Sequence, residues 1–226
     1  MEHIEKQFTE LGGKFITSYA NLKEKVAKIK AVIFDWDGVF NNGLKISDVG
    51  SAFSEPDTMG MNMFKLDYWL RNRHLPYTFI ITGENNQMAL KIANREKMNA
   101  VFLSYINKTE ALNIICDKYG LKKEEVAFMY DDILDIGVAK EVGVSILISR
   151  SGSPLTTNYV ISNGICDYVT GNPGGEFAVR EVCELLIGTN GDMSKTIDTR
   201  IRFKGDYEKY LAERGLIETQ LIRFGE

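Results

Sequence analysis

Residues 31–40 read Ala-Val-Ile-Phe-Asp-Trp-Asp-Gly-Val-Phe and give the strongest indication of the fold. The first four predict a buried β-strand, and Asp35 and Asp37 follow at its carboxyl end. Residues two apart in an extended chain lie on the same side, and Gly38 permits a tight turn after them. The two carboxylates could hold a divalent cation while one of them attacks an electrophile. The alternative is an Asp-Gly turn with a spare aspartate on the surface.

Apolar runs alternate with helical patterns along the rest of the central chain. Five short runs are predicted as strands: Ala31–Phe34, Tyr77–Thr82, Ala100–Leu103, Val126–Tyr130 and Ser145–Ile148. Five stretches are predicted as helices: Thr58–Asn72, Asn85–Lys97, Lys108–Tyr119, Asp132–Val142 and Glu176–Leu186. This alternation predicts an α/β fold with a doubly wound, mostly parallel sheet. Such sheets bind ligands at the carboxyl ends of their strands, where Asp35 and Asp37 stand.

Three parts are expected along the chain. Residues 1–30 carry a helical stripe of apolar residues, interrupted at Gly12-Gly13, and should form one or two helices packed on the core or on another subunit. Residues 31–187 form the expected main domain, with a β-hairpin insert at about residues 43–57 that is too short to be a cap domain. Residues 188–226 form a tail, either disordered or docked on a neighbour, with a helix expected over Asp206–Arg214.

The composition is that of an ordinary soluble protein, with 44% hydrophobic and 26% charged residues among 226. A net charge of −4 gives no sign of nucleic-acid binding. No apolar run approaches the roughly 20 residues that a membrane-spanning helix needs, and the charged N-terminus is unlike a signal peptide. The three cysteines, Cys116, Cys166 and Cys183, are isolated and are expected to be reduced and packed. The resulting expectation is a cytoplasmic protein without membrane or nucleic-acid partners.

Two polar elements follow later strands of the predicted sheet. Thr82-Gly83 ends the second strand, where a hydroxyl and a backbone N–H could grip a phosphate oxygen beside a helix N-terminus. The alternative for this pair is an ordinary helix cap. Lys108 opens a helix, where its charge opposes the helix dipole, so it could serve to neutralise a phosphate. The alternative is an exposed lysine without a function.

Three acids gather where the fourth predicted strand ends. Asp131 stands at the strand tip, Asp132 follows it, and Asp135 lies one helical turn later, back toward the tip. Acids in a first helical turn commonly do no more than complement the helix dipole. Three crowded carboxylates repel one another unless a cation neutralises them, and Mg²⁺ prefers oxygen ligands. The cluster therefore indicates a magnesium site.

These four elements, in this order and each at a strand end, resemble the haloacid dehalogenase superfamily of phosphohydrolases over about residues 30–187. The hairpin insert, the sequence Asn107–Leu112 and the run Ala178–Leu186 after Pro173-Gly174-Gly175 resemble its small, capless branch. That branch includes the phosphatases of 3-deoxy-D-manno-octulosonate 8-phosphate and of nine-carbon keto sugar acids. The resemblance implies a homotetramer in which the hairpin and a neighbour's C-terminal tail close the site.

The resemblance also implies roles for the acids. Asp35 would be the nucleophile that becomes an aspartyl-phosphate. Asp37 would protonate the leaving oxygen of the sugar and then deprotonate the attacking water, and its backbone carbonyl would bind Mg²⁺. Asp131 would complete the metal site with Asp35, and Asp132 and Asp135 would support the metal or its waters.

Further implied roles concern the phosphoryl group. Thr82, the N–H of Gly83 and Lys108 would hold its oxygens. The negative charge of this group repels an anionic nucleophile, so Mg²⁺ and Lys108 must offset it. A covalent intermediate on the enzyme splits one difficult step into two easier ones.

The chain departs from the family pattern at several positions. Relatives often carry Arg before the acid that matches Asp57, whereas this chain has Pro56. Glu84 stands where octulosonate enzymes often have Arg, which resembles the nine-carbon branch more. Tyr130 replaces a Gly before the acidic pair and could crowd the metal or point away. Asp57 and Glu84 are expected to contact substrate, and Arg180 would lie near it or fix the tail.

The leading hypothesis from the sequence is a Mg²⁺-dependent phosphatase acting on a phosphorylated sugar acid, a small-molecule ester. The octulosonate branch would place it in lipopolysaccharide biosynthesis. One alternative keeps the phosphatase and changes the substrate to another small phosphate ester. The other is a catalytically weak binding or assembly protein on the same fold, suggested by Tyr130, Pro56 and the added terminal segments.

Overall fold

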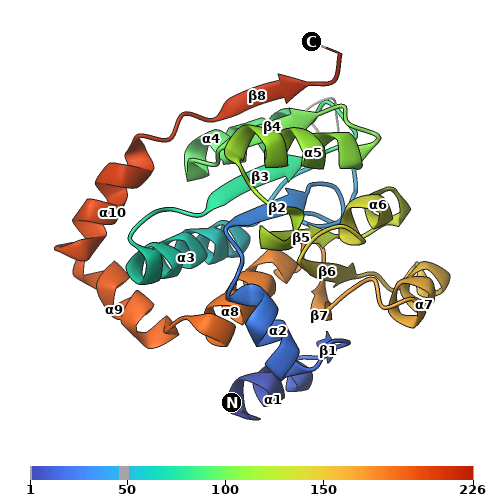
Figure 1. Ribbon diagram of the computed structural model, residues 1–226, viewed down its shortest axis with the longest axis horizontal. Coiled ribbons are helices and arrows are strands. Elements are labelled where there is room, and N and C mark those ends of the chain that lie inside the picture. Colours follow the sequence, from blue (N-terminus) through green and yellow to red (C-terminus); the bar gives the residue numbers. More distant parts are fainter. Residues whose placement is uncertain (1, 46–50, 226) are drawn as a thin grey trace.

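The computed structural model describes residues 2–45 and 51–225, and its centre is the predicted parallel sheet (Figure 1). The five predicted strands are β2 (Ala31–Asp35), β3 (Tyr77–Ile81), β4 (Ala100–Leu103), β5 (Val126–Tyr130) and β6 (Val144–Ser149). They lie in the order β6-β5-β2-β3-β4, and each neighbouring pair is parallel. Because β2 lies between β3 and β5, the three strands that lead to the predicted acids and Thr82 are neighbours.

Three further strands extend the sheet to eight among the described residues. They are β7 (Tyr168–Pro173), parallel to β6, β1 (Lys14–Phe15), antiparallel to β7, and β8 (Gln220–Arg223), parallel to β4. The sequence analysis missed them because β7 contains a Gly and a Pro, β1 has only two residues, and β8 is half polar. The described residues form one α/β layer arrangement with no separate cap domain, as predicted.

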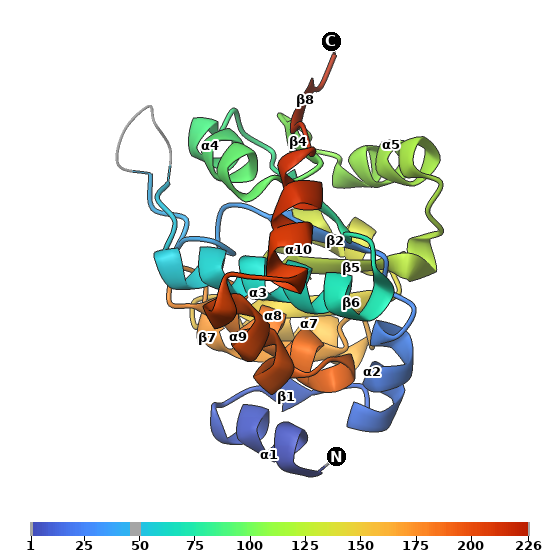
Figure 2. The same cartoon turned by 90° about the vertical axis from the view of Figure 1, so that its left-hand side faces the viewer.

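Helices cover both faces of the sheet (Figures 1 and 2). One face is covered by α2 (Tyr19–Val26), α3 (Glu55–Asn72), α4 (Gln87–Glu96) and α8 (Ala178–Asn190). The other is covered by α5 (Lys108–Tyr119), α6 (Ile136–Ala139) and α7 (Pro154–Ser162). Val32 and Phe34 pack toward the first group, and Ala31 and Ile33 toward the second, so successive residues of β2 are buried on opposite faces. No helix in the described ranges is long and apolar enough to cross a lipid bilayer.

The N-terminal stripe forms two helices, α1 (Glu2–Glu10) and α2, and the break falls at Gly12-Gly13 as expected. A Cβ on Gly13 would lie 1.7 Å from the hydroxyl of Tyr168 in β7, so only glycine lets the chain pass there. Leu22 and Val26 of α2 are buried in the main core. The N-terminal segment was expected to pack on the core or on another subunit, and the structure shows α2 packed on the core of its own chain.

The C-terminal tail is docked on its own chain, which corrects the expectation of a disordered or neighbour-bound tail. It forms α9 (Met193–Arg202), α10 (Asp206–Gly215) and β8. Tyr207 and Tyr210 of α10 pack against Leu66 and Trp69 of α3, and β8 then completes the sheet edge beside β4. Figure 2 shows α9 and α10 running past α3 toward that edge. The helix predicted over Asp206–Arg214 is confirmed, whereas α9 was not predicted.

The predicted β-hairpin falls partly on residues 46–50, which lie outside the described residues. The described residues on either side, Leu44-Lys45 and Ser51–Phe53, are not in strands. The chain then enters α3, where the Ser54 hydroxyl accepts a hydrogen bond from the Asp57 N–H and caps the helix. Pro56 occupies the first turn of α3, a position where a missing N–H costs nothing.

The helix predicted over Asp132–Val142 is wrong in its extent. The chain forms a 3₁₀ turn, η2 (Ile133–Asp135), followed by the single turn of α6. Asp132 starts this turn by accepting a hydrogen bond from the Ile133 N–H at 2.7 Å. A second 3₁₀ turn, η1 (Lys123–Glu125), leads into β5. The short turn after β5 keeps Asp135 close to the strand tip.

Candidate active site

A pocket of about 400 Å³ opens at the carboxyl ends of β2, β3 and β5. Its lining contains most of the residues singled out in the sequence: Asp35, Asp37, Thr82, Gly83, Glu84, Lys108, Asp131, Asp132 and Asp135. These residues come from loops after three neighbouring strands and from the start of α5. The edge of a parallel sheet is where such folds bind ligands, so the pocket is the candidate active site.

Three of the acids form a compact buried cluster. One carboxylate oxygen each of Asp35, Asp131 and Asp135 lies within 4.8 Å of the others. Burial raises the pKa of all three above the ordinary value, and repulsion from Asp135 adds to the shift at Asp35 and Asp131. The pKa of Asp131 is raised to about 7, although Arg150 partly offsets the shift. Asp135, expected only to support the metal, is a full member of this cluster.

Gly38 explains why the tips of β2 and β5 approach so closely. Its backbone has φ of +88°, which favours glycine. A Cβ at this position would lie 2.0 Å from Oδ2 of Asp131. Any side chain here would therefore push Asp131 away from Asp35 and open the cluster.

Lys108 is buried between two of these acids, so the alternative of an exposed lysine is wrong. Its Nζ donates to Oδ1 of Asp35 and to Oδ1 of Asp135, both at 2.5 Å. Burial opposes the charge of Lys108, but the two carboxylates outweigh it and raise the lysine pKa above its ordinary value. The lysine is thus a fixed positive charge directly beside the predicted nucleophile.

Asp37 lies beside the acid cluster rather than in it. Its Oδ1 accepts a hydrogen bond from the Ser51 hydroxyl and its Oδ2 accepts one from Nδ2 of Asn86, both at 2.9 Å. Asn86 also donates to Oγ1 of Thr82 at 2.8 Å. The sequence analysis singled out neither Ser51 nor Asn86, since isolated polar residues in loops carry no local signal of this contact.

Arg150 is a further pocket residue that the sequence analysis missed. It follows β6 in the sequence Arg-Ser-Gly-Ser, which is typical of a solvent-exposed loop. Its Nη1 lies 2.9 Å from Oδ2 of Asp131 and 3.3 Å from Oδ2 of Asp132. Lys108 and Arg150 therefore place positive charge beside different acids of the pocket.

The structure does not bring Asp57 and Arg180 to the pocket. Oδ1 of Asp57 accepts a hydrogen bond at 2.9 Å from the backbone N–H of Arg180, in the first turn of α8. A Cβ on Gly60 would lie 2.9 Å from Cα of Arg180, so α3 and α8 pack in close contact here. The side chain of Arg180 pairs with Glu184 one turn later on α8. These residues join two helices, a tertiary contact that sequence alone could not distinguish from a substrate contact.

Two other departures from the family pattern have simple structural explanations. The Tyr130 side chain lies in the core, where its ring stacks on Phe128 with centroids 5.6 Å apart. Its side chain therefore lies on the other side of the strand from that of Asp131, because the two residues are consecutive. Glu84 lines the pocket mouth, and its largely exposed carboxylate lies 3.5 Å from Nζ of Lys45.

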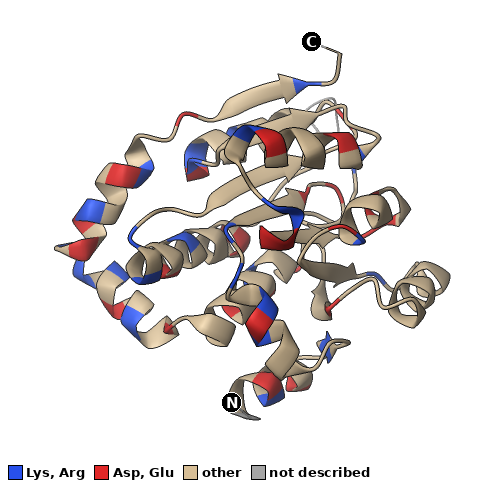
Figure 3. Ribbon diagram, in the orientation of Figure 1, with Lys and Arg blue, Asp and Glu red and all other residues tan. Residues whose placement is uncertain are grey.

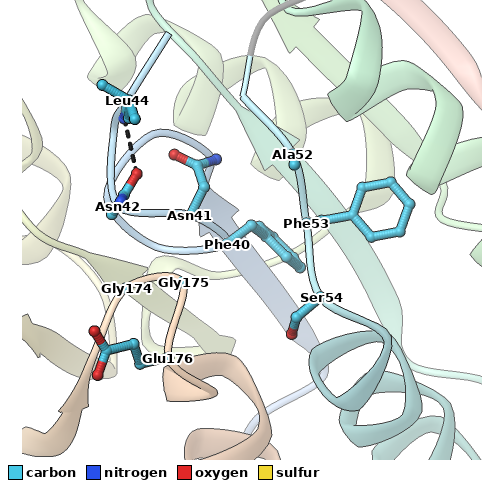
Figure 4. Close-up of a pocket in the computed structure, with 10 residues that line it drawn as sticks. All are labelled: Phe40, Asn41, Asn42, Leu44, Ala52, Phe53, Ser54, Gly174, Gly175 and Glu176. Atoms are coloured by element: carbon cyan, nitrogen blue, oxygen red, sulfur yellow. Dashed lines mark hydrogen bonds between the residues drawn. The ribbon is translucent and has the colours of Figure 1, made fainter. Parts of the chain in front are cut away.

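A second cavity of about 280 Å³ lies next to the turn after β2 (Figure 4). Asn41, Asn42 and Leu44 line one side, and the turn between β7 and α8 lines another. A Cβ on Gly174 in that turn would lie 1.9 Å from the carbonyl oxygen of Gly38, so the two turns are in direct contact. The β7–α8 turn thus supports the Gly38 turn from the side opposite Asp131.

The buried acids fit a divalent cation of the magnesium type. Asp35, Asp131 and Asp135 offer carboxylate oxygens, the ligands that Mg²⁺ prefers. Oδ2 of Asp131 is buried and accepts no hydrogen bond from the described residues, although the charge of Arg150 is near. Such an atom is costly to bury unless a cation or donor satisfies it. Elsewhere, acidic and basic residues are interspersed along the helices (Figure 3).

Comparison with known proteins finds phosphatases that are similar to this chain. No family model matches the chain. It is 26% identical over 196 residues to the 3-deoxy-D-manno-octulosonate 8-phosphate phosphatase KdsC of Escherichia coli, covering 83% of this chain and 96% of the relative. One solved structure is that of the 3-deoxy-D-manno-octulosonate 8-phosphate phosphatase from Moraxella catarrhalis, in complex with magnesium, phosphate and KDO. It superposes on this chain with a TM-score of 0.69 at 26% identity and covers 81% of this chain and 99% of that one.

The chain is similar in sequence and fold to members of the haloacid dehalogenase superfamily. A chain described as a hydrolase of this superfamily, from Legionella pneumophila, also superposes, with a TM-score of 0.68 at 25% identity over 81% of this chain and 95% of that one. The resemblance inferred from the four strand-end elements is therefore confirmed. These similarities support a phosphoric monoester hydrolase.

Proposed function

We propose that this chain is a Mg²⁺-dependent phosphatase that hydrolyses a phosphorylated sugar acid through an aspartyl-phosphate. The observation that carries the proposal is the buried cluster of Asp35, Asp131 and Asp135 with Lys108 bonded to two of them. The substrate class is supported by the names of the relatives, which act on 3-deoxy-D-manno-octulosonate 8-phosphate. Related keto sugar acid phosphates belong to the same proposed class.

The proposed reaction has two steps. A carboxylate oxygen of Asp35 attacks phosphorus while the bond from phosphorus to the sugar oxygen breaks, and Asp37 gives its proton to that oxygen. Asp37 then takes a proton from water as the water oxygen attacks phosphorus, which releases inorganic phosphate and restores Asp35. Both aspartates return to their starting states, so the residues complete a cycle. A positioned acid–base group of this kind contributes typically about 10²–10⁴-fold to a rate.

Positive charge beside the acids suits this chemistry. Asp35, Asp131 and Asp135 would hold Mg²⁺, which when bound offsets the negative charge of the phosphoryl group. Lys108 would exchange its contact with Asp35 for one with a phosphoryl oxygen as that oxygen gains charge. Thr82 and the N–H of Gly83 line the same pocket and would donate to the remaining oxygens.

Two further expectations stay predictions: a homotetramer, which rests on the resemblance, and a cytoplasmic location, which rests on the composition and the N-terminus. Light scattering after size-exclusion chromatography tests the first, and a monomer would contradict it. The α10–β8 tail that was expected to reach a neighbour pairs with its own β4, so a tetramer would have to close the pocket with other segments.

The experiment that tests the proposed function measures inorganic phosphate release with and without Mg²⁺. The panel holds octulosonate 8-phosphate, nine-carbon keto sugar acid 9-phosphates, nucleotides and hexose phosphates. Metal-dependent release concentrated on one sugar acid is expected. Even release over the panel would retain the phosphatase and reject the sugar-acid assignment. No release by folded protein would favour a binding role on the same fold.

A further inference from the structure

Asn86 occupies a helix-capping position but does not cap its helix. It directly precedes α4, where an Asn side chain ordinarily accepts a hydrogen bond from a backbone N–H of the first turn. Here its side chain makes no such bond, although the residue is buried. The side chain of Asn86 is therefore free to bond to residues outside α4.

Nδ2 of Asn86 instead joins two predicted functional residues. It donates one hydrogen to Oδ2 of Asp37 at 2.9 Å and the other to Oγ1 of Thr82 at 2.8 Å. The reverse orientation of the amide would set its oxygen against a carboxylate oxygen, and two acceptors at this distance repel. The contact with Oδ2 of Asp37 therefore fixes which amide atom faces Thr82.

This arrangement decides where the hydroxyl proton of Thr82 points. Oγ1 accepts from Nδ2 of Asn86 and, at 3.3 Å, from the backbone N–H of Glu84. A hydroxyl oxygen has two lone pairs, so both are used and the O–H can only donate. It finds no acceptor within the described part of the chain, and Thr82 lines the pocket beside Lys108. The threonine is thus prepared to donate to an anion there.

Ser51 holds the other oxygen of Asp37. Its Oγ lies 2.9 Å from Oδ1 of Asp37 and 3.1 Å from the carbonyl oxygen of Leu44, and its single proton can be donated to either acceptor. Both carboxylate oxygens of Asp37 thus have a side-chain partner, Ser51 at Oδ1 and Asn86 at Oδ2.

We infer that Asn86 and Ser51 are positioning residues of the reaction: Asn86 orients Thr82 as a donor to the phosphoryl group, and both hold the Asp37 carboxylate in place. The inference rests on the proposed function. Neither residue touches the reacting atoms, and each acts through a residue that does. Asn86 acts through both Thr82 and Asp37, whereas Ser51 acts through Asp37 alone.

This difference gives the two residues separate signatures. Asn86→Ala should weaken binding of inorganic phosphate in the presence of Mg²⁺ by about three- to tenfold, since one oriented donor is lost. It should also lower kcat about three- to tenfold, because a donor that fixes the position of Asp37 is gone. Ser51→Ala should lower kcat about three- to tenfold, with phosphate affinity unchanged.

The matched control is Asn94→Ala on the same helix, where an exposed Asn donates only to the carbonyl of Leu90. It should behave as wild type in every measurement. Asn86→Ser, a good capping residue too short to reach both partners, replaces Asn86→Ala if that variant unfolds. Calorimetry with phosphate measures the affinity, and steady-state kinetics measure kcat.

The outcomes separate this inference from the proposed function. If wild type releases phosphate and both Asn86 variants match Asn94→Ala in phosphate affinity and kcat, the positioning role is wrong. If Ser51→Ala keeps the wild-type kcat, its role is wrong. If wild type releases no phosphate from the whole panel, the proposed function fails, and loss of phosphate affinity in Asn86→Ala still tests the Thr82 contact.

Discussion

Two buried groups of charged residues in the described part of the chain are built differently. At the strand tips, three buried carboxylates share one buried lysine, and their pKa values are raised. Between α3, α4 and α10, Lys65 donates to the carbonyls of Glu96 and Lys97 at the end of α4, and Arg214 pairs with Glu96 at 2.8 Å. Here each of the two cations is bonded to an oxygen acceptor at the end of α4.

The comparison teaches how to separate function from architecture. An excess of buried charge of one sign costs stability and persists only where something else gains from it. Matched partners that join helix ends stabilise the fold and need no ligand. We therefore assign the strand-tip cluster to catalysis and the α3–α4–α10 cluster to stability, and each prediction below tests one side of this contrast.

The largest effect is expected for Asp35→Asn. It removes the nucleophile, so kcat should fall by roughly 10⁴-fold or more. Removing one of three crowded acids should leave the free energy of unfolding unchanged or raise it in metal-free protein. Steady-state phosphate release and urea unfolding measure the two quantities. If the variant kept its turnover, Asp35 would not be the nucleophile.

A smaller kinetic effect with a clear stability signature is expected for Lys108→Met. The rate should fall about 10²–10³-fold because a fixed positive charge is lost beside the phosphoryl group. Without Lys108 the three acids have no buried counter-charge, so the metal-free variant should unfold at lower temperature than wild type. Added Mg²⁺ should narrow that difference. A variant with unchanged kinetics and unchanged thermal unfolding would contradict this reading of Lys108.

Magnesium affinity should depend on pH. The pKa of Asp131 is raised to about 7, so below that pH a proton competes with the metal for this carboxylate. The dissociation constant of Mg²⁺ should rise by up to about tenfold for each pH unit below about 7 and level off above it. Calorimetry between pH 5.5 and about 8.5 measures it. A flat profile would argue against Asp131 as a ligand.

The smallest expected effect concerns the α3–α4–α10 cluster and is a change of the unfolding free energy with pH. Burial lowers the pKa of Lys65 to about 7, with Arg214 adding to the shift and Glu96 opposing it. Its ordinary value is 10.5, so between these two pH values the unfolded chain binds more protons than the folded one. The free energy of unfolding should therefore rise with pH across this range, by at most about 1.4 kcal/mol per unit.

Lys65→Met provides the matched comparison for that prediction. The variant cannot titrate at this position, so its unfolding free energy should lack the Lys65 part of the rise between pH 7 and about 9. Its kcat/KM should stay near the wild-type value because Lys65 is far from the pocket lining. If wild type and Lys65→Met showed the same pH dependence of the unfolding free energy in urea, the assignment of this effect to Lys65 would be wrong. A large loss of kcat/KM in the folded variant would also contradict it.

The sequence predicted what local patterns can encode. Apolar runs located β2 to β6, and strand-end residues such as Asp35, Thr82 and Asp131 had to meet once those strands paired in parallel. Gly38 was recognised as a turn residue, but its contact with Asp131 needed the structure.

The remainder depended on tertiary contacts without a local signal. Ser51, Asn86 and Arg150 are single polar residues in loops, and their role follows only from their neighbours. Asp57 was misread as a substrate contact because a carboxylate that holds a helix end looks the same in sequence. The strand β8 pairs with β4 across more than a hundred residues of chain, which no short pattern encodes.

The most direct test of the central claim is to trap the covalent intermediate. Protein in single turnover with Mg²⁺ and the preferred sugar acid phosphate is quenched with borohydride, which reduces an acyl phosphate to an alcohol, and its peptides are mapped by mass spectrometry. The account predicts that residue 35 alone is converted to homoserine, and only when substrate and Mg²⁺ are both present. Turnover with no conversion at residue 35, or with conversion at another aspartate, would contradict it.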